Sequence, residues 1–372
     1  SFPIFPKPTM LHPLSRTVLP LLIAALLFVG CGPSDDASTG SASTAAPTAD
    51  ANEDVVLERI AFGSCNDQND EQPLWAAIRQ HEPDLWMWLG DNIYGDTRDM
   101  SALRAMYEQQ QSHAGYQQLV AATRVVGTWD DHDYGANDAG RHYPKRDSSQ
   151  QLFLDFMGVP ADDPRREREG VYAAHTYGPP GQRVKVILLD TRYHRDRLTT
   201  APDPDRRYQA SAGDFLGEAQ WAWLEDELAN SDAQIHLIGS SIQVIPEQHG
   251  WEKWANFPQA RQRLFDTIRA SGAPGVLLVS GDRHLAEHSR LGADAIGYPL
   301  HEITASGLTH SYEGAEEPNR HRVGALYDGL NYGLMQIDWD AAPTQIVLQV
   351  RGRNDQVALA DTLSLADLQP GG

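Results

Sequence analysis

The sequence predicts an α/β protein built around a mixed β-sheet. Apolar runs of strand length alternate with amphipathic segments of helical period through most of the chain. From about residue 298 onward, three further strand-like runs follow one another without helices between them. Parallel strands need crossover connections, so this tail adds antiparallel strands to the sheet. A hydrophobic content of 41% with 22% charged residues supplies a large core.

The N-terminal residues 1–31 have the pattern of an export signal. Lys7 and Arg16 precede an apolar run at 18–29, which is too short for a membrane-spanning helix of about 20 residues. The run ends in Gly30 and Cys31, which resembles the lipobox of bacterial lipoproteins. We therefore expect a lipidated Cys31 that anchors the protein to a membrane, facing the periplasm or the cell surface. An ordinary secretory signal with an incidental cysteine is the alternative.

Residues 32–54 are expected to form a flexible tether. They consist almost wholly of Gly, Pro, Ser, Asp, Ala and Thr, a composition that cannot bury a core. The globular body is then expected at 55–372. If Cys31 is lipidated, Cys65, the only other cysteine, has no partner for a disulfide.

Within the body, the predicted elements follow in chain order. The predicted strands are 59–62, 84–89, 123–129, 184–189, 234–245 and 275–280, followed by 298–306, 332–339 and 344–351 in the tail. The predicted helices are 73–81, 101–111, 217–230 and 259–270. Pro73 suits a first helical turn, and Glu218 places negative charge at a helix start.

Metal-type ligands follow four of these strands. Cys65 comes after the first strand, and a loop bracketed by glycines brings Asp91, Tyr94 and Asp96 after the second. In open α/β sheets, ligands bind in the loops that follow the carboxyl ends of strands. A buried structural thiol at Cys65 and a capping role for an aspartate in a turn are the alternatives at these two places.

The third and fourth loops carry the densest charge. After the third strand come Asp130, Asp131, His132 and Asp133, whose carboxylates would repel one another without a cation. Solvated surface charge is the alternative reading of this loop. After the fourth strand come Asp282 and His284, which project to the same side of an extended loop because they are two residues apart.

With these motifs in place, the sequence resembles the alkaline phosphatase D-like family of the calcineurin-like metallophosphoesterase superfamily. The matching motifs stand in order at 63–65, 90–96, 129–133, 189–192 and 281–284. The resemblance implies a four-layer α-β-β-α metallophosphoesterase sandwich with mixed sheets and a dinuclear metal site. It also implies hydrolysis of phosphomonoesters or phosphodiesters, with a hydroxide held between the two ions as nucleophile.

The resemblance assigns ligands to the two ions. The first would be held by Cys65, Asp91, Tyr94 and Asp131, and the second by the two bridging aspartates Asp91 and Asp131 with Asn137, Asp282 and His284. Spacing leaves open whether Asp130 or Asp131 bridges, and whether Asn137 or Asp138 is a ligand. His132 then becomes the candidate to stabilise the phosphate or to protonate the leaving oxygen.

The donor set suggests which ions bind. Thiolate, phenolate and carboxylates on one ion favour Fe³⁺, and an oxygen-rich second site with one imidazole suits a divalent ion, which the resemblance implies to be Ca²⁺. Export in the unfolded state would require metal loading outside the cytoplasm, so Zn²⁺, Mn²⁺ or Mg²⁺ are alternatives. Arg192 is expected either to bind a phosphate oxygen or to form a salt bridge to a surface carboxylate.

A formal charge of −21 argues against a nucleic-acid-binding surface. The leading hypothesis is an exported, lipid-anchored, metal-dependent phosphoester hydrolase. A phosphodiesterase or phospholipase-type hydrolase and a non-catalytic cation-binding surface lipoprotein are the alternatives. His301 is expected to be a structural histidine rather than a ligand, and the segment 139–170 to cover the cleft.

Overall fold

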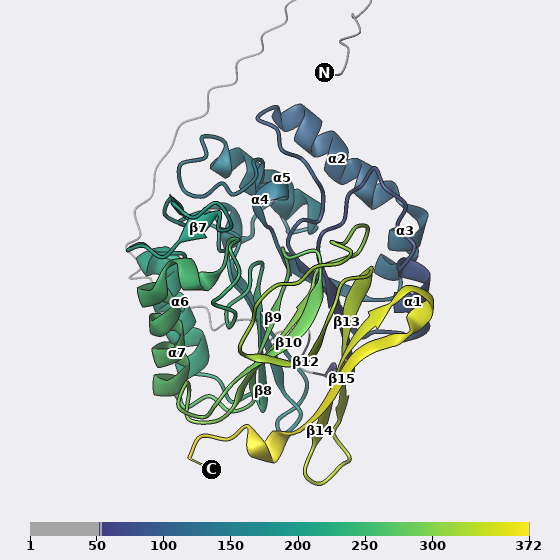
Figure 1. Cartoon of the computed structure of the whole chain (residues 1–372). Helices are drawn as coiled ribbons and strands as arrows, with labels where there is room; N and C mark the ends of the chain where they lie inside the picture. Colours follow the sequence, from purple (N-terminus) through teal and green to yellow (C-terminus); the bar gives the residue numbers. More distant parts are fainter. Residues whose placement is uncertain (1–51, 53, 372) are drawn as a thin grey trace, which may run out of the picture. The chain divides into compact units, whose positions relative to one another are not determined.

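Two large β-sheets form the centre of the molecule (Figure 1). The computed structural model describes residue 52 and residues 54–371. The predicted signal peptide at 1–31, including Cys31, and most of the predicted tether lie outside these described residues. In the part of the chain that the structure describes, no helix is long and apolar enough to cross a membrane.

Sheet A has six strands in the order β15-β14-β13-β1-β2-β3. Its strands are β1 (Arg59–Gly63), β2 (Leu85–Leu89), β3 (Arg124–Thr128), β13 (Asn331–Asp338), β14 (Gln345–Gly352) and β15 (Val357–Ser364). β1, β2 and β3 are parallel, whereas β13, β14 and β15 add antiparallel pairs. The three parallel strands therefore end at one edge, where their loops can converge.

Sheet B has seven strands in the order β12-β10-β11-β9-β8-β5-β4. Its strands are β4 (Ala173–Tyr177), β5 (Val184–Leu188), β8 (Ile235–Ser240), β9 (Val276–Ser280), β10 (Ala286–Leu291), β11 (Leu300–Ala305) and β12 (Arg322–Tyr327). β5, β8, β9 and β11 are parallel, and β4, β10 and β12 are antiparallel to their neighbours. The short hairpin of β6 (Thr199–Thr200) and β7 (Tyr208–Gln209) stands apart from both sheets.

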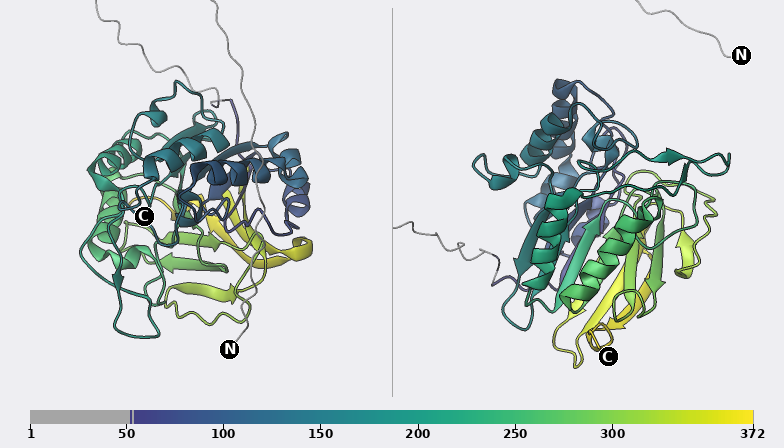
Figure 2. Two further views of the ribbon diagram at one scale, coloured as in Figure 1. Left: turned by 90° about the horizontal axis from the view of Figure 1, so that it is seen from above. Right: turned by 90° about the vertical axis from the view of Figure 1, so that its left-hand side faces the viewer.

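Helices cover the outer face of each sheet, as the views in Figure 1 and Figure 2 show. The α-helices are α1 (Trp75–Gln80), α2 (Met100–Ser112), α3 (Ala114–Val120), α4 (Asp131–Tyr134), α5 (Arg146–Phe156), α6 (Gly217–Ala229) and α7 (Pro258–Ser271). Short 3-10 helices occur at Pro164–Arg166, Trp254–Asn256, Arg353–Asp355 and Leu365–Asp367. The predicted four-layer α-β-β-α sandwich with mixed sheets is confirmed.

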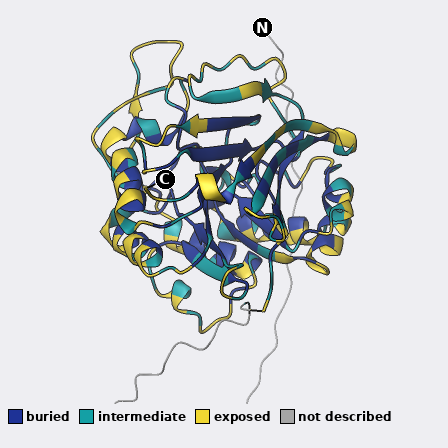
Figure 3. Ribbon diagram, turned by 90° about the horizontal axis from the view of Figure 1, so that it is seen from below, coloured by how far each residue is buried: buried dark blue, intermediate teal, exposed yellow. Residues whose placement is uncertain are grey.

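Alternation along β2 shows how the layers are built. Leu85, Met87 and Leu89 belong to the core that joins the two sheets and extends to α6 and α7. Trp86 and Trp88 point the other way, into a second core with α1, α2, α3 and α5. Successive strand residues face opposite sides, so a fully apolar strand can serve two cores at once. Figure 3 shows the result, with buried strands inside and exposed residues on the outer faces of the helices.

Most predicted elements are observed, with three differences. The predicted strand at 234–245 ends at Ser240, and the residues after it form a buried loop. Helix α3 and several edge strands lack a strong sequence signal. The segment 139–170 does not simply cover the cleft, because α5 inside it buries Leu152, Phe153 and Phe156 in the second core.

Candidate metal centre

Four loops at the carboxyl ends of strands bring the predicted ligands together. Cys65 follows β1, Asp91 follows β2, Asp131 follows β3, and Asp282 and His284 follow β9 of the other sheet. One ligand atom each from Cys65, Asp91 and His284 lie within 4.8 Å of one another. The same limit holds for oxygen atoms of Asp91, Asp130, Asp131 and Asp282. We call Cys65, Asp91, Asp131, Asp282 and His284 the metal-ligand cluster.

The backbone of the cluster adopts conformations that side chains rarely take. φ is +60° at Cys65, +48° at Asp91, +67° at Asp282 and +56° at His284. Such left-handed residues cost free energy, and they persist where the surrounding structure holds a functional site in shape. Four of them in one cluster indicate that the loops are built to aim these side chains at a common point.

Glycines allow the loops to approach one another this closely. A Cβ on Gly90 would lie 2.4 Å from Cβ of Asp130, and φ at Gly90 is +92°. A Cβ on Gly281 would lie 2.4 Å from Oγ of Ser64. Both positions therefore require glycine, because any side chain would push apart the strand ends that carry the ligands.

The predicted ligand Tyr94 also faces the cluster. Its hydroxyl lies 3.0 Å from Nε2 of His284. Sγ of Cys65 lies 3.6 Å from Oδ2 of Asp91, so the buried thiol and carboxylate converge with the half-buried phenol and imidazole. His310 and Tyr312, which the sequence analysis missed, pack against His284, His310 edge-on and Tyr312 tilted, with ring centroids 4.3 and 4.5 Å away.

Electrostatics indicate that this group of side chains needs cations. Burial, together with neighbouring carboxylates, raises the pKa of Cys65 and of Asp91 well above their ordinary values. Burial likewise raises the pKa of Asp282 and of Tyr94. Burial thus favours the protonated forms of these groups, whereas bound cations replace such protons and allow the ligands to ionise.

Unpartnered buried atoms support the same conclusion. Oδ1 of Asp131, Oδ2 of Asp130 and Nδ1 of His284 are buried and have no hydrogen-bond partner among the described residues. Leaving such an atom unpaired costs about 1–3 kcal/mol, and more for a charged group. A carboxylate or imidazole that binds a metal ion is paired by it, so the donor set fits a metal centre.

Asp130 and Asp131 have different surroundings. Oδ1 of Asp130 accepts hydrogen bonds of 2.5 Å from Nε of Arg192 and from Oγ of Ser241. Burial raises the pKa of Asp130 to about 6. At Asp131 burial opposes ionisation, but Arg192 and His132 outweigh it and lower the pKa to about 2. Asp130 is paired with Arg192, whereas Asp131 ionises readily, so these contacts favour Asp131 as the ligand. Each aspartate has one oxygen without a hydrogen-bond partner among the described residues.

Asn137 and Asp138 differ in their contacts. Asn137 is exposed, and its Nδ2 donates a 2.6 Å hydrogen bond to Oδ2 of Asp138. The backbone N–H of Asp138 donates to Oδ2 of Asp131, and the carboxylate of Asp138 groups with those of Asp131 and Glu252 within 4.8 Å. Asp138 thus contacts Asp131 directly, and the role of Asn137 as a ligand stays a prediction.

Arg192 differs from the expectation that it binds phosphate or a surface carboxylate. Its side chain is fully buried, with Nε on Asp130 and Nη1 2.7 Å from Oε2 of Glu252. Arg195 is equally buried, and its Nε lies 3.0 Å from Oε1 of Glu252. We call Asp130, Glu252, Arg192 and Arg195 the arginine network. Arg192 therefore forms salt bridges, but with buried carboxylates and not with a surface carboxylate.

His132 lies at the rim of the cluster, as expected for a group that contacts substrate. Its Nδ1 lies 2.6 Å from Oδ2 of Asp96, and its ring stacks on Tyr94 at 4.2 Å. Burial acts to lower its pKa, but Asp131, Asp91 and Asp96 outweigh burial and raise it to about 11. Asp96 stands in the glycine-bracketed loop after β2, so the sequence identified the loop without revealing this contact.

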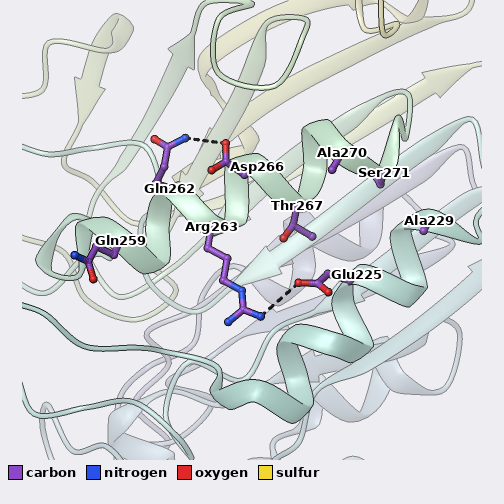
Figure 4. A pocket seen from close by; sticks show the side chains of 9 residues that line it. All are labelled: Glu225, Ala229, Gln259, Gln262, Arg263, Asp266, Thr267, Ala270 and Ser271. Carbon is purple, nitrogen blue, oxygen red and sulfur yellow. Dashed lines mark hydrogen bonds and ion pairs between the residues drawn. The ribbon is translucent and has the colours of Figure 1, made fainter.

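A separate cavity of 680 Å³ lies between α6 and α7 on the outside of sheet B (Figure 4). Its lining includes Glu225, Arg263 and Asp266 and contains no residue of the metal-ligand cluster. The cavity is therefore not part of the candidate metal centre.

Two sheets with flanking helices and a carboxylate, thiol and histidine cluster at their carboxyl ends define the metallophosphoesterase class of fold. The sequence model of the PhoD-like phosphatase family matches residues 60–331. The chain therefore belongs to the PhoD-like phosphatase family. The matched region starts at β1 and includes every residue of the metal-ligand cluster.

Comparisons with individual proteins agree with this assignment. Alkaline phosphatase D of Bacillus subtilis is 25% identical over 280 residues, which are 63% of this chain and 47% of that protein. The chain thus spans about half the length of this curated relative. The solved structure of PhoD superposes with a TM-score of 0.68 at 20% identity, covering 84% of this chain and 69% of the other.

More distant structures share the fold. Purple acid phosphatase PPD1 from yellow lupin has a TM-score of 0.55 at 12% identity, covering 83% of this chain and 54% of that one. GAP50, described as the anchor in the inner membrane complex of Plasmodium, also has a TM-score of 0.55 at 12% identity, covering 83% of this chain and 89% of that one. At these identities the similarity concerns the fold alone.

Proposed function

We propose that the protein is a metal-dependent phosphoester hydrolase with a dinuclear centre. The observation that carries the proposal is the buried metal-ligand cluster, with unpartnered oxygen and nitrogen atoms, in a chain of the PhoD-like phosphatase family. Cys65, Asp91, Tyr94 and Asp131 would hold one ion, and Asp282 and His284, with the bridging aspartates and Asp138 or Asn137, the other. When bound, the two ions supply positive charge that neutralises the phosphoryl oxygens.

His132 is the proposed proton donor. Its Nδ1 lies 2.6 Å from Oδ2 of Asp96, which orients the ring and favours the protonated imidazole. Nε2 has no hydrogen-bond partner among the described residues, so it is the nitrogen that can reach a substrate oxygen. A protonated imidazole there can donate to a phosphate oxygen or to the leaving oxygen.

Arg192 and Arg195 have a positioning role in this proposal. They neutralise Asp130 and Glu252, and the ion pairs hold Asp130 in place. Because Asp131 is the next residue along the chain, its position is fixed as well. Because both guanidinium groups are buried, substrate binding falls to the ions and to His132.

The proposal is tested by hydrolysis of an aryl phosphate with the Asp131→Asn and Asp282→Asn variants. Each change removes one ligand oxygen charge with little change in volume, and we expect a loss of at least about 100-fold in kcat/KM. Asp266→Asn on the exposed face of α7 is the matched control and keeps full activity. Full activity in both ligand variants would refute the proposal.

The identity of the ions is part of the proposal. Thiolate and phenolate donors favour Fe³⁺ in the first site, and the oxygen-rich second site suits Ca²⁺, with Zn²⁺, Mn²⁺ or Mg²⁺ as alternatives. Elemental analysis of the purified protein and its Cys65→Ala variant checks this assignment. We expect the Cys65→Ala variant to carry one metal ion fewer per chain than the wild type.

Export and membrane anchoring through Cys31 are proposed from the sequence alone. Gly30 and Cys31 follow an apolar run at the position of a lipobox. In bacterial cells the Cys31→Ala variant is expected to lose lipid labelling and to leave the membrane fraction. Unchanged fractionation would favour the ordinary secretory signal.

Two other functions remain as candidates. A phosphodiesterase or phospholipase-type activity is suggested by the proposed membrane tether, and it predicts faster turnover of a diester than of its monoester. A non-catalytic cation-binding surface protein is suggested by the charge of −21. It also fits the fold shared with GAP50, which is described as an anchor. This last candidate predicts metal binding without turnover.

A further inference from the structure

Two histidines and an aspartate meet away from the metal-ligand cluster. His288 is on β10, His301 is on β11 and Asp361 is on β15. Nε2 of His288 lies 2.9 Å from Nδ1 of His301, and Nδ1 of His288 lies 3.4 Å from Oδ2 of Asp361. One ligand atom from each of the three lie within 4.8 Å of one another. We call these residues the cross-sheet triad, because β10 and β11 belong to sheet B and β15 to sheet A.

The triad is separate from the metal-ligand cluster. The two share no residue, and in the part of the chain that the structure describes no group of possible ligand atoms within 4.8 Å combines a triad residue with a residue of the metal-ligand cluster. Ions held by the metal-ligand cluster therefore cannot be shared with the triad.

Space is available on both sides of the triad. A cavity of 530 Å³ is lined by His301 and Asp361, and one of 140 Å³ is lined by His288 and Asp361. Both histidines are about 95% buried, whereas the Asp361 side chain is 35% exposed. Solvent can thus reach the triad from the Asp361 side and complete the coordination of an ion.

The protonation states suit metal binding. Burial lowers the pKa of His288, and burial with His288 nearby lowers the pKa of His301 to about 4. Both imidazoles are therefore neutral at pH 7 and can offer a nitrogen lone pair. Two neutral imidazoles and one carboxylate form a typical ligand set for Zn²⁺, which leaves a fourth position for water.

We propose that His288, His301 and Asp361 form a third metal site that binds a Zn²⁺-type divalent ion and joins the edge of sheet A to sheet B. The sequence alone predicts a structural histidine at position 301. It does not reveal the site, because the partners of His301 lie 13 and 60 residues away and only the fold brings them together. This site is independent of the proposed hydrolytic function. A metal-free chain of hydrogen bonds from Asp361 through His288 to His301 is the competing explanation.

Zinc stoichiometry distinguishes the two explanations. The full chain is purified, incubated with Zn²⁺, passed through a desalting column and measured for zinc per chain, alongside His301→Gln and Asp361→Asn. His175→Gln on β4 is the matched control, because His175 is a similarly neutral histidine with a pKa of about 4 outside any ligand group. We expect both triad variants to carry one zinc fewer than the wild type and the control. Titration should show at least tenfold weaker binding at that site.

Equal zinc content in all four proteins would overturn the proposal. Asp361→Asn keeps the test valid if His301→Gln fails to fold, because the Asp361 side chain is partly exposed. Phosphoester hydrolysis is measured on the same samples. Loss of the third zinc with unchanged hydrolysis supports the site, whereas hydrolysis absent from every sample would count against the proposed function and leave the zinc result standing.

Discussion

The metal-ligand cluster and the arginine network are neighbouring buried groups of acids that differ in how their charge is compensated. In the arginine network, Asp130 and Glu252 are paired with Arg192 and Arg195. In the metal-ligand cluster, the ion pairs of the described residues include neither Asp91 nor Asp131, and Asp282 has only Arg283 at 3.8 Å. The two groups touch through the adjacent residues Asp130 and Asp131.

The difference shows that arginine side chains neutralise one group of buried acids, whereas the other group depends on bound cations. Burying an unpaired carboxylate is costly, so each buried acid needs a cation, a proton or a metal. In the arginine network each acid has an arginine as counter-charge, although Oδ2 of Asp130 and Nη2 of Arg192 have no hydrogen-bond partner among the described residues. In the metal-ligand cluster the acids lack such a close positive partner, and this is the property that suits the cluster to bind cations.

Removal of the ions should have the largest effect. Chelation is expected to abolish phosphoester hydrolysis and to lower the free energy of unfolding by about 4 kcal/mol for each ion that is present at 1,000 times its Kd. Thermal unfolding with and without chelator measures this, and re-addition of metal should restore both properties. An unchanged unfolding temperature would mean that the metal-ligand cluster compensates its charge in some other way.

Breaking the arginine network should come next. Arg192→Met leaves Asp130 and Glu252 buried without this partner and is expected to cost about 3 kcal/mol of unfolding free energy, with or without metal. Urea denaturation measures the loss. Arg263→Met, which removes the exposed pairs of Arg263 with Glu218 and Glu225, is the control and should cost under about 1 kcal/mol. Equal costs would refute the contrast between the two kinds of pair.

The contact between Asp96 and His132 should have a smaller effect, on rate. Asp96→Asn removes a carboxylate that raises the pKa of His132, so His132 loses its proton at lower pH. We expect kcat to fall about tenfold and the alkaline limb of the pH–rate profile to move to lower pH. Asp99→Asn, at the nearby N-cap of α2, is the control and leaves the profile in place. An unshifted limb would exclude His132 as the titrating group.

A buried histidine outside both groups should show the smallest effect, on the pH dependence of stability. Burial lowers the pKa of His236 to about 4, from 6.5 in the unfolded chain. Between these values the unfolded state binds more protons, so stability falls as the pH decreases below 6.5. His236→Gln should remove about 1 kcal/mol of the decrease between pH 6.5 and 5.5. Parallel pH curves for variant and wild type would contradict the shift.

The sequence was enough to predict the strands and the loops that carry chemistry. Apolar runs at β2 and β9 are local signals, and the Asp, Gly and His residues after them mark strand ends directly. The predicted ligands Cys65, Asp91 and His284 are brought together as expected, since parallel strands end at the same edge. Edge strands such as β12 were missed, because their half-exposed residues lack a strong pattern.

Tertiary structure decided which members of adjacent pairs face the cluster and which charges meet. Asp130 accepts a hydrogen bond from Arg192, whereas Asp131 accepts one from the backbone N–H of Asp138 and Asn137 donates to the carboxylate of Asp138. Glu252 and His310 have no local signal, because their partners come from distant parts of the chain. Spacing along the chain predicts which loop carries a residue. The direction in which its side chain points depends on backbone dihedrals and on neighbours that only folding brings close.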